Sequence, residues 1–314
     1  MKICVLSYES IKQSKELYVQ LLEELKKRFS SVLMVPIEKV TINIGDGSTR
    51  VMYRDKELED FDVILPRIGP SYAHYGYLIL KLLEGKVYFP NKPESYLIAR
   101  DKVYNLMVLA SHGIPVPKTI ATVSKQIAKN LSSEVGEPLI VKAEGRSGGK
   151  GVIFAKDAKS ANTMIDAFSI SKGEKILLEE FIEAKGDVRL FVIGDKVHAA
   201  AMRVASEKDI RSNIHAGGRY VPYEPDREMK NIAVKAAKVI GAGICGVDIM
   251  AGKDGPKVLE CNMNPGFMIT KVTGVNLFKR IADYLYDEAK RFYSGENILT
   301  EFVADVLKYL KNHL

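Results

Sequence analysis

Cysteine is scarce in this sequence of 314 residues, which contains only Cys4, Cys245 and Cys261. An odd number of thiols, each within an apolar run, argues against a disulfide framework and predicts reduced, buried thiols in a cytoplasmic protein. The opening MKICVLS is too short for the apolar core of a secretory signal, and no apolar run approaches the length of a membrane span. We therefore expect no association with a membrane.

Other chemical signatures are also missing. The five histidines are scattered, so no zinc site is predicted. No Ser/His/Asp or Cys/His pattern indicates a nucleophile, and aromatic and basic residues do not interleave as they do in single-strand nucleic-acid binders. The net charge is +7, but Lys and Arg are mixed with Asp and Glu along the chain. The surplus therefore favours an anionic ligand such as a nucleotide over a nucleic acid.

The sequence contains 46% hydrophobic residues, which predicts an ordinary folded protein. Strand and helix patterns alternate at its start. Strands are predicted at Lys2–Leu6, Val32–Pro36 and Val63–Pro66, with a helix at Ser10–Phe29. This βαβ alternation predicts an α/β domain around a largely parallel sheet. The next predicted helix, Glu94–Ser111, stops at a glycine and two prolines.

The rest of the chain is predicted to be of mixed character. Short strands and helices run to Phe181, a β-rich segment covers Val188–Met263, and helices follow at Leu277–Phe292 and Ile298–Leu310. We divide the chain into an N-terminal α/β domain (1–95), a lid with a small lobe (96–181), a C-terminal lobe carrying a metal site (182–293) and a helical tail (294–314).

The most informative stretch is Val258–Asn262. In a strand, Glu260 and Asn262 point to one face and Cys261 to the other. The turn at Gly252–Gly255 predicts a hairpin that brings Asp248 beside that pair. Such oxygen ligands suit magnesium, which takes further partners from nucleotide phosphates. The alternative is a polar strand end followed by an Asn-Pro-Gly turn.

A second signal is the glycine-rich loop Gly145–Gly151, flanked by two β-branched strands. Its glycines allow backbone N–H groups to approach an anion, so it is predicted to be a phosphate-binding flap. It is not a P-loop, because Lys150 is followed by Gly151 where a Ser or Thr should be. The alternative is an ordinary hairpin turn.

Cations and an apolar strand accompany these motifs. Lys142 enters the glycine loop among apolar neighbours, so we expect it to be partly buried beside an anion. Lys102 could add a second cation, or could be an exposed helical lysine. The strand Ile176–Glu183 could contact a purine base, with Glu183 or Asp187 near a ribose, or could be a plain core strand.

Two arginines could bind a phosphoryl group or a carboxylate with two hydrogen bonds each, namely Arg203 and Arg211. The alternative for both is ordinary surface charge. Ser212, Asn213, His215 and the following glycine pair indicate a shaped loop beside Arg211.

In order along the chain, these motifs resemble the ATP-grasp superfamily and, within it, the RimK-type glutamate ligases. The matching stretches are Asp101-Lys102, Val141-Lys142 with the glycine loop, Glu179–Ile182, Gly186–Arg189, Arg211–Gly218, Gly246–Asp248 and Glu260–Asn262. The resemblance implies an α/β and α+β protein in which two lobes hold ATP behind an N-terminal pre-ATP-grasp domain.

The resemblance also implies roles for individual residues. Nucleotide binding falls to Lys102, Lys142, Gly145, Ser147, Gly148, Gly149, Glu179, Glu180, Phe181, Ile182, Asp187, Arg211, Ser212 and Asn213. Metal binding falls to Asp248, Glu260 and Asn262, and catalytic contacts to Arg203, Arg211 and Asn213. The implied cofactors are ATP and Mg2+, with Mn2+ as an alternative ion.

The implied reaction joins an amino acid, L-glutamate, to an acceptor carboxylate through an acyl phosphate. The acceptor would be a small coenzyme or a protein C-terminus, and the enzyme a homo-oligomer. Two alternatives are a ligase for an amino-group carrier protein of lysine or arginine biosynthesis and an inactive ATP-binding regulatory protein. Asn264, Phe267 and Ala216 depart from the family pattern near the expected acceptor pocket, which leaves the acceptor open.

Overall fold

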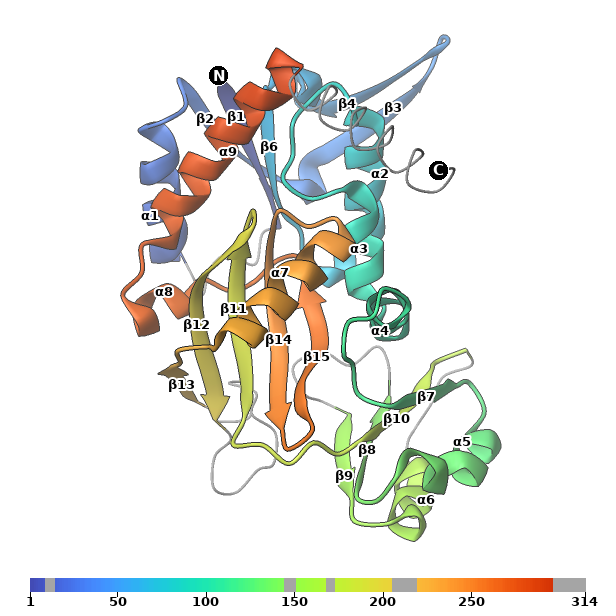
Figure 1. The fold of residues 1–314 in the computed structure, drawn as a ribbon. Coiled ribbons are helices and arrows are strands. Elements are labelled where there is room, and N and C mark those ends of the chain that lie inside the picture. Colours follow the sequence, from blue (N-terminus) through green and yellow to red (C-terminus); the bar gives the residue numbers. More distant parts are fainter. Residues whose placement is uncertain (9–14, 144–150, 168–172, 205–218, 296–314) are drawn as a thin grey trace, which may run out of the picture. The chain divides into compact units, whose positions relative to one another are not determined.

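The computed structural model describes residues 1–8, 15–143, 151–167, 173–204 and 219–295. The chain forms two compact units (Figure 1). Unit 1 contains residues 1–97 and 276–314, and unit 2 contains residues 98–275. Helix α9 (Leu277–Ser294) therefore belongs with the N-terminal segment, whereas the sequence grouped it with the C-terminal lobe. The four-part division by motif remains a prediction.

Unit 1 is built on the predicted parallel sheet, in the order β2-β1-β6. Its strands are β1 (Lys2–Ser7), β2 (Ser31–Pro36) and β6 (Val63–Arg67). Helix α1 (Lys15–Lys26) buries Leu17, Leu21 and Leu25 at helical spacing, while residues 10–14 of the predicted helix lie outside the described residues. The α/β interpretation of this region is confirmed.

Unit 1 also contains shorter elements. They are the 3-10 turns η2 (Ile37–Lys39), η3 (Leu58–Asp60) and η4 (Pro70–Tyr72), strands β3 (Val40–Gly45), β4 (Ser48–Tyr53) and β5 (Lys56–Glu57), and helix α2 (Ala73–Leu83). Strands β3 and β4 form a hairpin whose two turn residues, Asp46 and Gly47, both have positive φ, at 49° and 71°. An Asp-Gly pair suits such a turn because its twist matches that of the strands.

The predicted helix at Glu94–Ser111 is two helices, α3 (Pro93–Arg100) and α4 (Lys102–Ser111). The break lies at Asp101, whose backbone is extended and whose carboxylate accepts a hydrogen bond from the Tyr104 amide at 3.0 Å. An Asp with this geometry is an N-cap. Helix α4 ends at Ser111, and Gly113 takes a left-handed φ of 68°, as the predicted glycine stop requires.

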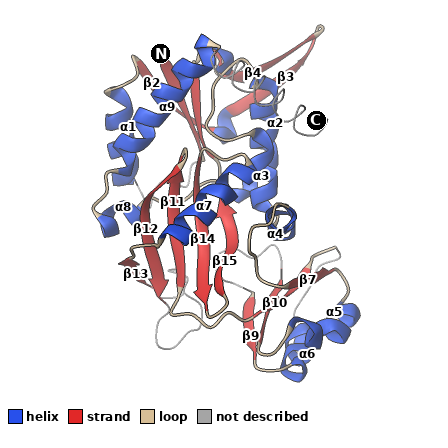
Figure 2. Cartoon of the chain, viewed as in Figure 1, coloured by secondary structure: helices blue, strands red, loops and turns tan. Residues whose placement is uncertain are grey.

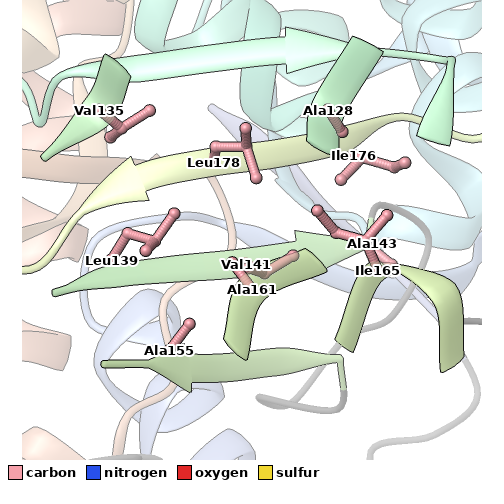
Figure 3. Packing of buried hydrophobic residues seen from close by; sticks show 10 residues of the cluster. All are labelled: Ala128, Val135, Leu139, Val141, Ala143, Ala155, Ala161, Ile165, Ile176 and Leu178. Carbon is pink, nitrogen blue, oxygen red and sulfur yellow. The ribbon is translucent and has the colours of Figure 1, made fainter. Parts of the chain in front are cut away.

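Unit 2 contains two antiparallel sheets. The first has the order β7-β10-β8-β9 and carries helices α5 (Lys125–Leu131) and α6 (Ala158–Ala167) with the turn η5 (Ser132–Val135). Its strands are β7 (Thr119–Thr122), β8 (Leu139–Ala143), β9 (Val152–Ala155) and β10 (Ile176–Glu180). Side chains of the strands and of both helices meet in one apolar core, which includes Val141, Ile165 and Leu178 (Figure 3).

The second sheet has the order β13-β12-β11-β14-β15. Its strands are β11 (Asp187–Ile193), β12 (Lys196–Val204), β13 (Arg219–Pro222), β14 (Ile244–Gly252) and β15 (Gly255–Asn262). Helix α7 (Arg227–Ile240) packs on β11, β12, β14 and β15, and α8 (Met268–Thr273) packs on β12 and β13 (Figure 2). The sequence interpretation of this region as β-rich missed α7.

Candidate functional site

The hairpin predicted around the metal ligands is confirmed. Strands β14 and β15 pair antiparallel, so that Asp248 lies directly opposite Glu260 and Gly246 opposite Asn262. The turn falls at Gly252–Gly255, as predicted. Cys261 is buried on the other face of the strand, as the alternation of side chains requires. The fold therefore brings two carboxylates and an amide together on one sheet face.

Two arginines bind Asp248, whose side chain is fully buried. Arg189 lies opposite Asp248 on the neighbouring strand β11 and donates from Nε to Oδ1 at 2.7 Å and from Nη2 to Oδ2 at 2.6 Å. This is the two-pronged geometry for which a guanidinium is suited. Arg203 adds a bond from Nη2 to Oδ2 of Asp248 at 2.6 Å.

Arg203 also binds Asp187, the residue opposite it in the β11–β12 ladder, with a bond from Nε at 2.7 Å. Burial alone would lower the pKa of Arg203, but Asp248 and Asp187 raise it above its usual value. The guanidinium is thus held charged between two carboxylates. The alternative of ordinary surface charge is wrong for Arg203, because its side chain is only 14% exposed.

Lys102 supplies the cation for Glu260, with Nζ 2.9 Å from Oε2. The Lys102 charge holds the pKa of Glu260 far below its usual range, against the effect of burial, and Arg189 and Arg203 contribute further. Glu260 in turn raises the pKa of Lys102, with smaller effects from Glu179 and Asp248. The charges of Lys102 and Glu260 therefore interact with each other and with those of Glu179, Asp248, Arg189 and Arg203.

Lys142 lies on β8 and pairs with Glu179 of the adjacent strand β10. Its side chain is 19% exposed, so the expectation of a partly buried lysine with an anionic partner is confirmed. Beyond Lys142, the Ala143 amide bonds to the Gly151 carbonyl at 3.1 Å and closes the base of the glycine loop. The predicted flap residues Gly145, Ser147, Gly148 and Gly149 lie outside the described residues.

The segment predicted to contact a base, Ile176–Glu183, consists of β10 and the three residues after it. The Glu180 amide donates to the Lys118 carbonyl at 3.0 Å, and the Phe181 amide to the Pro138 carbonyl at 3.3 Å. The Glu180 carboxylate accepts bonds from Lys257 Nζ at 2.5 Å and from the Lys118 amide at 2.8 Å. These two amides therefore already have protein partners, and the contact of this segment with a base stays a prediction.

The three proposed metal ligands fit a hard cation in chemistry and in the lone pairs they offer. A carboxylate oxygen has two lone pairs, and Asp248 Oδ1 accepts one hydrogen bond from the described residues. The Asn262 side-chain oxygen accepts one from the Asn264 amide at 3.0 Å. Asn264 Oδ1 is itself buried without a hydrogen-bond partner in the described structure, which suits a nearby cation or polar group.

No group of three or more His, Cys, Asp or Glu side chains in the described ranges is arranged to hold a metal ion. The proposed set of Asp248, Glu260 and Asn262 is not such a group, because its third member is an amide.

The described charged side chains around the proposed metal ligands are equal in number of each sign. The carboxylates are Glu179, Asp187, Asp248 and Glu260, and the cations are Lys102, Lys142, Arg189 and Arg203. Bound phosphates and a divalent cation would therefore compete with existing ion pairs.

Ion pairs and ladder positions bring together Lys102, Lys142, Glu179, Asp187, Arg203, Asp248, Glu260 and Asn262. Arg211, Ser212 and Asn213, like the flap residues, lie outside the described residues. The roles of all of them remain predictions. Sequence reasoning did not assign a role to Arg189. Its signal was its position two residues after Asp187, which places both on one face of a strand. Phe267, flagged as a departure near the acceptor, is a core residue stacked on Phe191 at 6.4 Å.

Comparison with known proteins connects this site to a family. Residues 1–95 match the family model described as the RimK PreATP-grasp domain. Residues 99–285 match the one described as the RimK-like ATP-grasp domain. The chain is 37% identical over 295 residues to the "Probable alpha-L-glutamate ligase" of Thioalkalivibrio sulfidiphilus, covering 92% of this chain and 97% of that protein. It is 39% identical over 260 residues to a protein of the same name in Legionella pneumophila strain Corby, covering 81% of this chain and 86% of that one.

Solved structures support the same fold. The ATP-grasp ligase PsnB, in complex with a minimal precursor, Mg and ADP, aligns with a TM-score of 0.68 at 21% identity, covering 92% of this chain and 98% of that one. The RimK domain protein from Sphaerobacter thermophilus aligns with a TM-score of 0.67 at 19% identity, covering 91% and 99%. With both the sequence families and the fold in agreement, the chain belongs to the RimK-like ATP-grasp family and is an ATP-dependent ligase.

Proposed function

We propose that this ligase adds L-glutamate to the carboxylate of an acceptor, using ATP and forming an acyl phosphate on the way. The observation that carries the proposal is the row formed by Arg189, Asp248 and Glu260 across β11, β14 and β15, with Lys102 at its end. Relatives named as probable alpha-L-glutamate ligases support the choice of amino acid.

The proposed reaction has two steps. The acceptor carboxylate attacks the terminal phosphorus of ATP, which forms an acyl phosphate and releases ADP. The glutamate amine then attacks the acyl carbon, a C–N bond forms, phosphate leaves, and the amine loses a proton. Both steps involve concentrated negative charge, so positioning and charge neutralisation supply most of the catalysis.

The chain's own residues divide this work. Lys102 and Lys142 have flexible stems, and each is paired with a carboxylate that it can exchange for a phosphate oxygen. Asp187 and Asp248 hold Arg203, so that its guanidinium lies beside the proposed metal ligand Asp248. Asp248, Glu260 and Asn262 would hold Mg2+, which would neutralise phosphate charge and orient the transferring phosphoryl group.

The direct test is Glu260→Gln, measured as ADP release with ATP, L-glutamate and an acceptor. We expect a loss of at least about 100-fold, because the variant removes a charged ligand of the Mg2+ that would neutralise the phosphates. Asp248→Asn is less suitable, since it leaves two buried arginines short of charge and also weakens the fold. Turnover of Glu260→Gln above half of the wild-type rate would contradict the assignment.

A matched control is Glu59→Gln, which breaks an exposed pair with Lys86 at 2.7 Å and is expected to keep full activity. The acceptor is identified in the same assay. A peptide with a free C-terminal carboxylate, a small acidic coenzyme and a carrier protein are supplied separately, and the product is weighed by mass spectrometry. ADP is released when the acyl phosphate forms, before L-glutamate reacts, so the product decides: a product without the added mass of a glutamate residue would contradict the proposed amino acid.

A further inference from the structure

Helix α4 contacts the metal-binding strand through Asn105 as well as through Lys102. Asn105 is 1% exposed. Its Nδ2 donates to the Cys261 carbonyl at 3.3 Å, and its Oδ1 accepts from the Cys261 amide at 3.2 Å. One side-chain amide thus binds both polar groups of a single residue's backbone.

This contact matters because β15 lies at the edge of its sheet. The outward N–H and C=O groups of an edge strand have no neighbouring strand and need other partners when they are buried. Asn105 provides both at Cys261, and the Pro115 carbonyl accepts from the Val258 amide at 2.8 Å further along. Residues from α4 and the segment after it therefore take the place of a further strand.

Cys261 stands between the two proposed metal ligands of β15, Glu260 and Asn262. Lys102, three residues before Asn105, binds the Glu260 side chain. Residues three apart lie on one face of a helix. The same face of α4 thus binds the Glu260 side chain through Lys102 and the Cys261 backbone through Asn105.

We propose that Asn105 is a positioning residue that fixes the spacing and direction of Glu260 and Asn262 through the Cys261 backbone. The inference rests on the proposed function, because it takes these two residues as Mg2+ ligands. Magnesium requires near-ideal geometry, so a strand free to shift by a few tenths of an ångström binds it less well. Asn105 itself touches neither nucleotide nor metal in this scheme.

The first readout needs no ligand and uses the buried Cys261 thiol. Alkylation of a buried thiol in the native protein requires local opening. In Asn105→Ala, which removes both hydrogen bonds, we expect Cys261 to be alkylated at least about 10-fold faster. Cys4, on β1 of unit 1, is the internal reference and should not change. Asn105→Gln keeps both amide groups but adds a methylene, and should give a smaller increase.

The second readout is the Mg2+ concentration that half-saturates ADP binding to the full chain, followed by calorimetry. We expect it to rise about 10-fold in Asn105→Ala, while the KM for L-glutamate changes less than twofold. The matched control is Asn91→Ala. Asn91 is a buried asparagine of unit 1 that donates to Tyr96 at 3.4 Å, and its loss should lower thermal stability without changing either readout.

The outcomes separate this inference from the proposed function. Faster Cys261 alkylation together with a higher Mg2+ requirement supports a positioning role. Faster alkylation with an unchanged Mg2+ requirement reduces Asn105 to a structural residue and overturns the inference, as does no change in either. Wild-type protein that binds ADP without any dependence on Mg2+ would instead contradict the proposed metal site. If Asn105→Ala does not fold, the same comparison is made with Asn105→Gln.

Discussion

At the scale of single residues, the described site depends on how buried charges are paired. Asp248 is fully buried and Arg189 is 8% exposed. Ions in such a place lose hydration that is regained only through close, well-directed partners. Burial alone would lower the pKa of Arg189, and Asp248 raises it above its ordinary value. The arginine thus keeps its charge, and Asp248 keeps a fixed orientation toward Glu260.

Replacing Arg189 by Gln tests this dependence. The variant leaves Asp248 with Arg203 as its charged partner, so we expect the free energy of unfolding to fall by about 3 to 5 kcal/mol. Urea denaturation followed by circular dichroism measures the change. The matched control is Arg50→Gln, which breaks an exposed pair with Glu57 at 3.5 Å and should cost less than about 0.5 kcal/mol. Equal losses in the two variants would contradict the special role of the buried pair.

At the scale of elements, a strand from each sheet of unit 2 is joined by a charged pair. Glu180 at the end of β10 binds Lys257 of β15, with both side chains about one quarter exposed. Burial alone would raise the pKa of Glu180. Hydrogen bonds from Lys257 and from the Lys118 amide outweigh it and lower the pKa below its ordinary value. The contact between the two strands therefore weakens in acid.

The sign of the pH dependence follows from this shift. Because the folded pKa of Glu180 is depressed, its contribution to stability is complete above the unfolded pKa of about 4.3 and is lost as the pH falls through the folded value. The difference in unfolding free energy between wild type and Glu180→Gln should be constant near pH 7 and shrink below about pH 4. Denaturant titrations from pH 3 to 7 measure it.

Lys257→Met is the companion variant, because it removes the main group that lowers this pKa. Its difference from wild type should shrink in acid in the same way. A difference for Glu180→Gln that stays constant down to pH 3 would show that Glu180 is not held in its charged form by the fold.

The local sequence pattern predicted a strand or helix correctly where the residues of that element alone are enough to define it. The alternation at Val258–Asn262 and the turn at Gly252–Gly255 predicted the hairpin, and the structure confirms it. The break at Asp101 was missed, because apolar spacing continues across it and the cap depends on one carboxylate. The partners of Asp248 depend on ladder register between β11 and β14, since Arg189 lies 59 residues away along the chain. Sequence spacing does not contain that register.

At the scale of the whole molecule, the chain leaves unit 1 and returns to it. Helix α9 buries Phe278, Ile281 and Leu285 and packs on α1, and Arg28 donates to Asp283 across that contact at 2.6 Å. Unit 2 has its own core, as in the sheet of β7 to β10 (Figure 3). In the described part of the chain, no helix has the length and hydropathy that a membrane crossing requires.

Unit 1 is discontinuous in sequence, so a substitution in its core should affect different segments from a substitution in the core of unit 2. Leu285→Ala removes a fully buried side chain from α9, and Leu178→Ala removes one from β10. Each should cost about 2 to 5 kcal/mol, from lost burial and from the cavity left behind. If the two units open separately, the loss appears only in the unit that carries the change. Hydrogen exchange read by mass spectrometry should then speed up in β1, β2 and α1 for Leu285→Ala, although these elements lie at residues 2–36, far from the substitution along the chain. For Leu178→Ala it should speed up in β7, β8 and β9. Faster exchange around β14 and β15 in Leu285→Ala, with β1 unchanged, would contradict the assignment of α9 to unit 1.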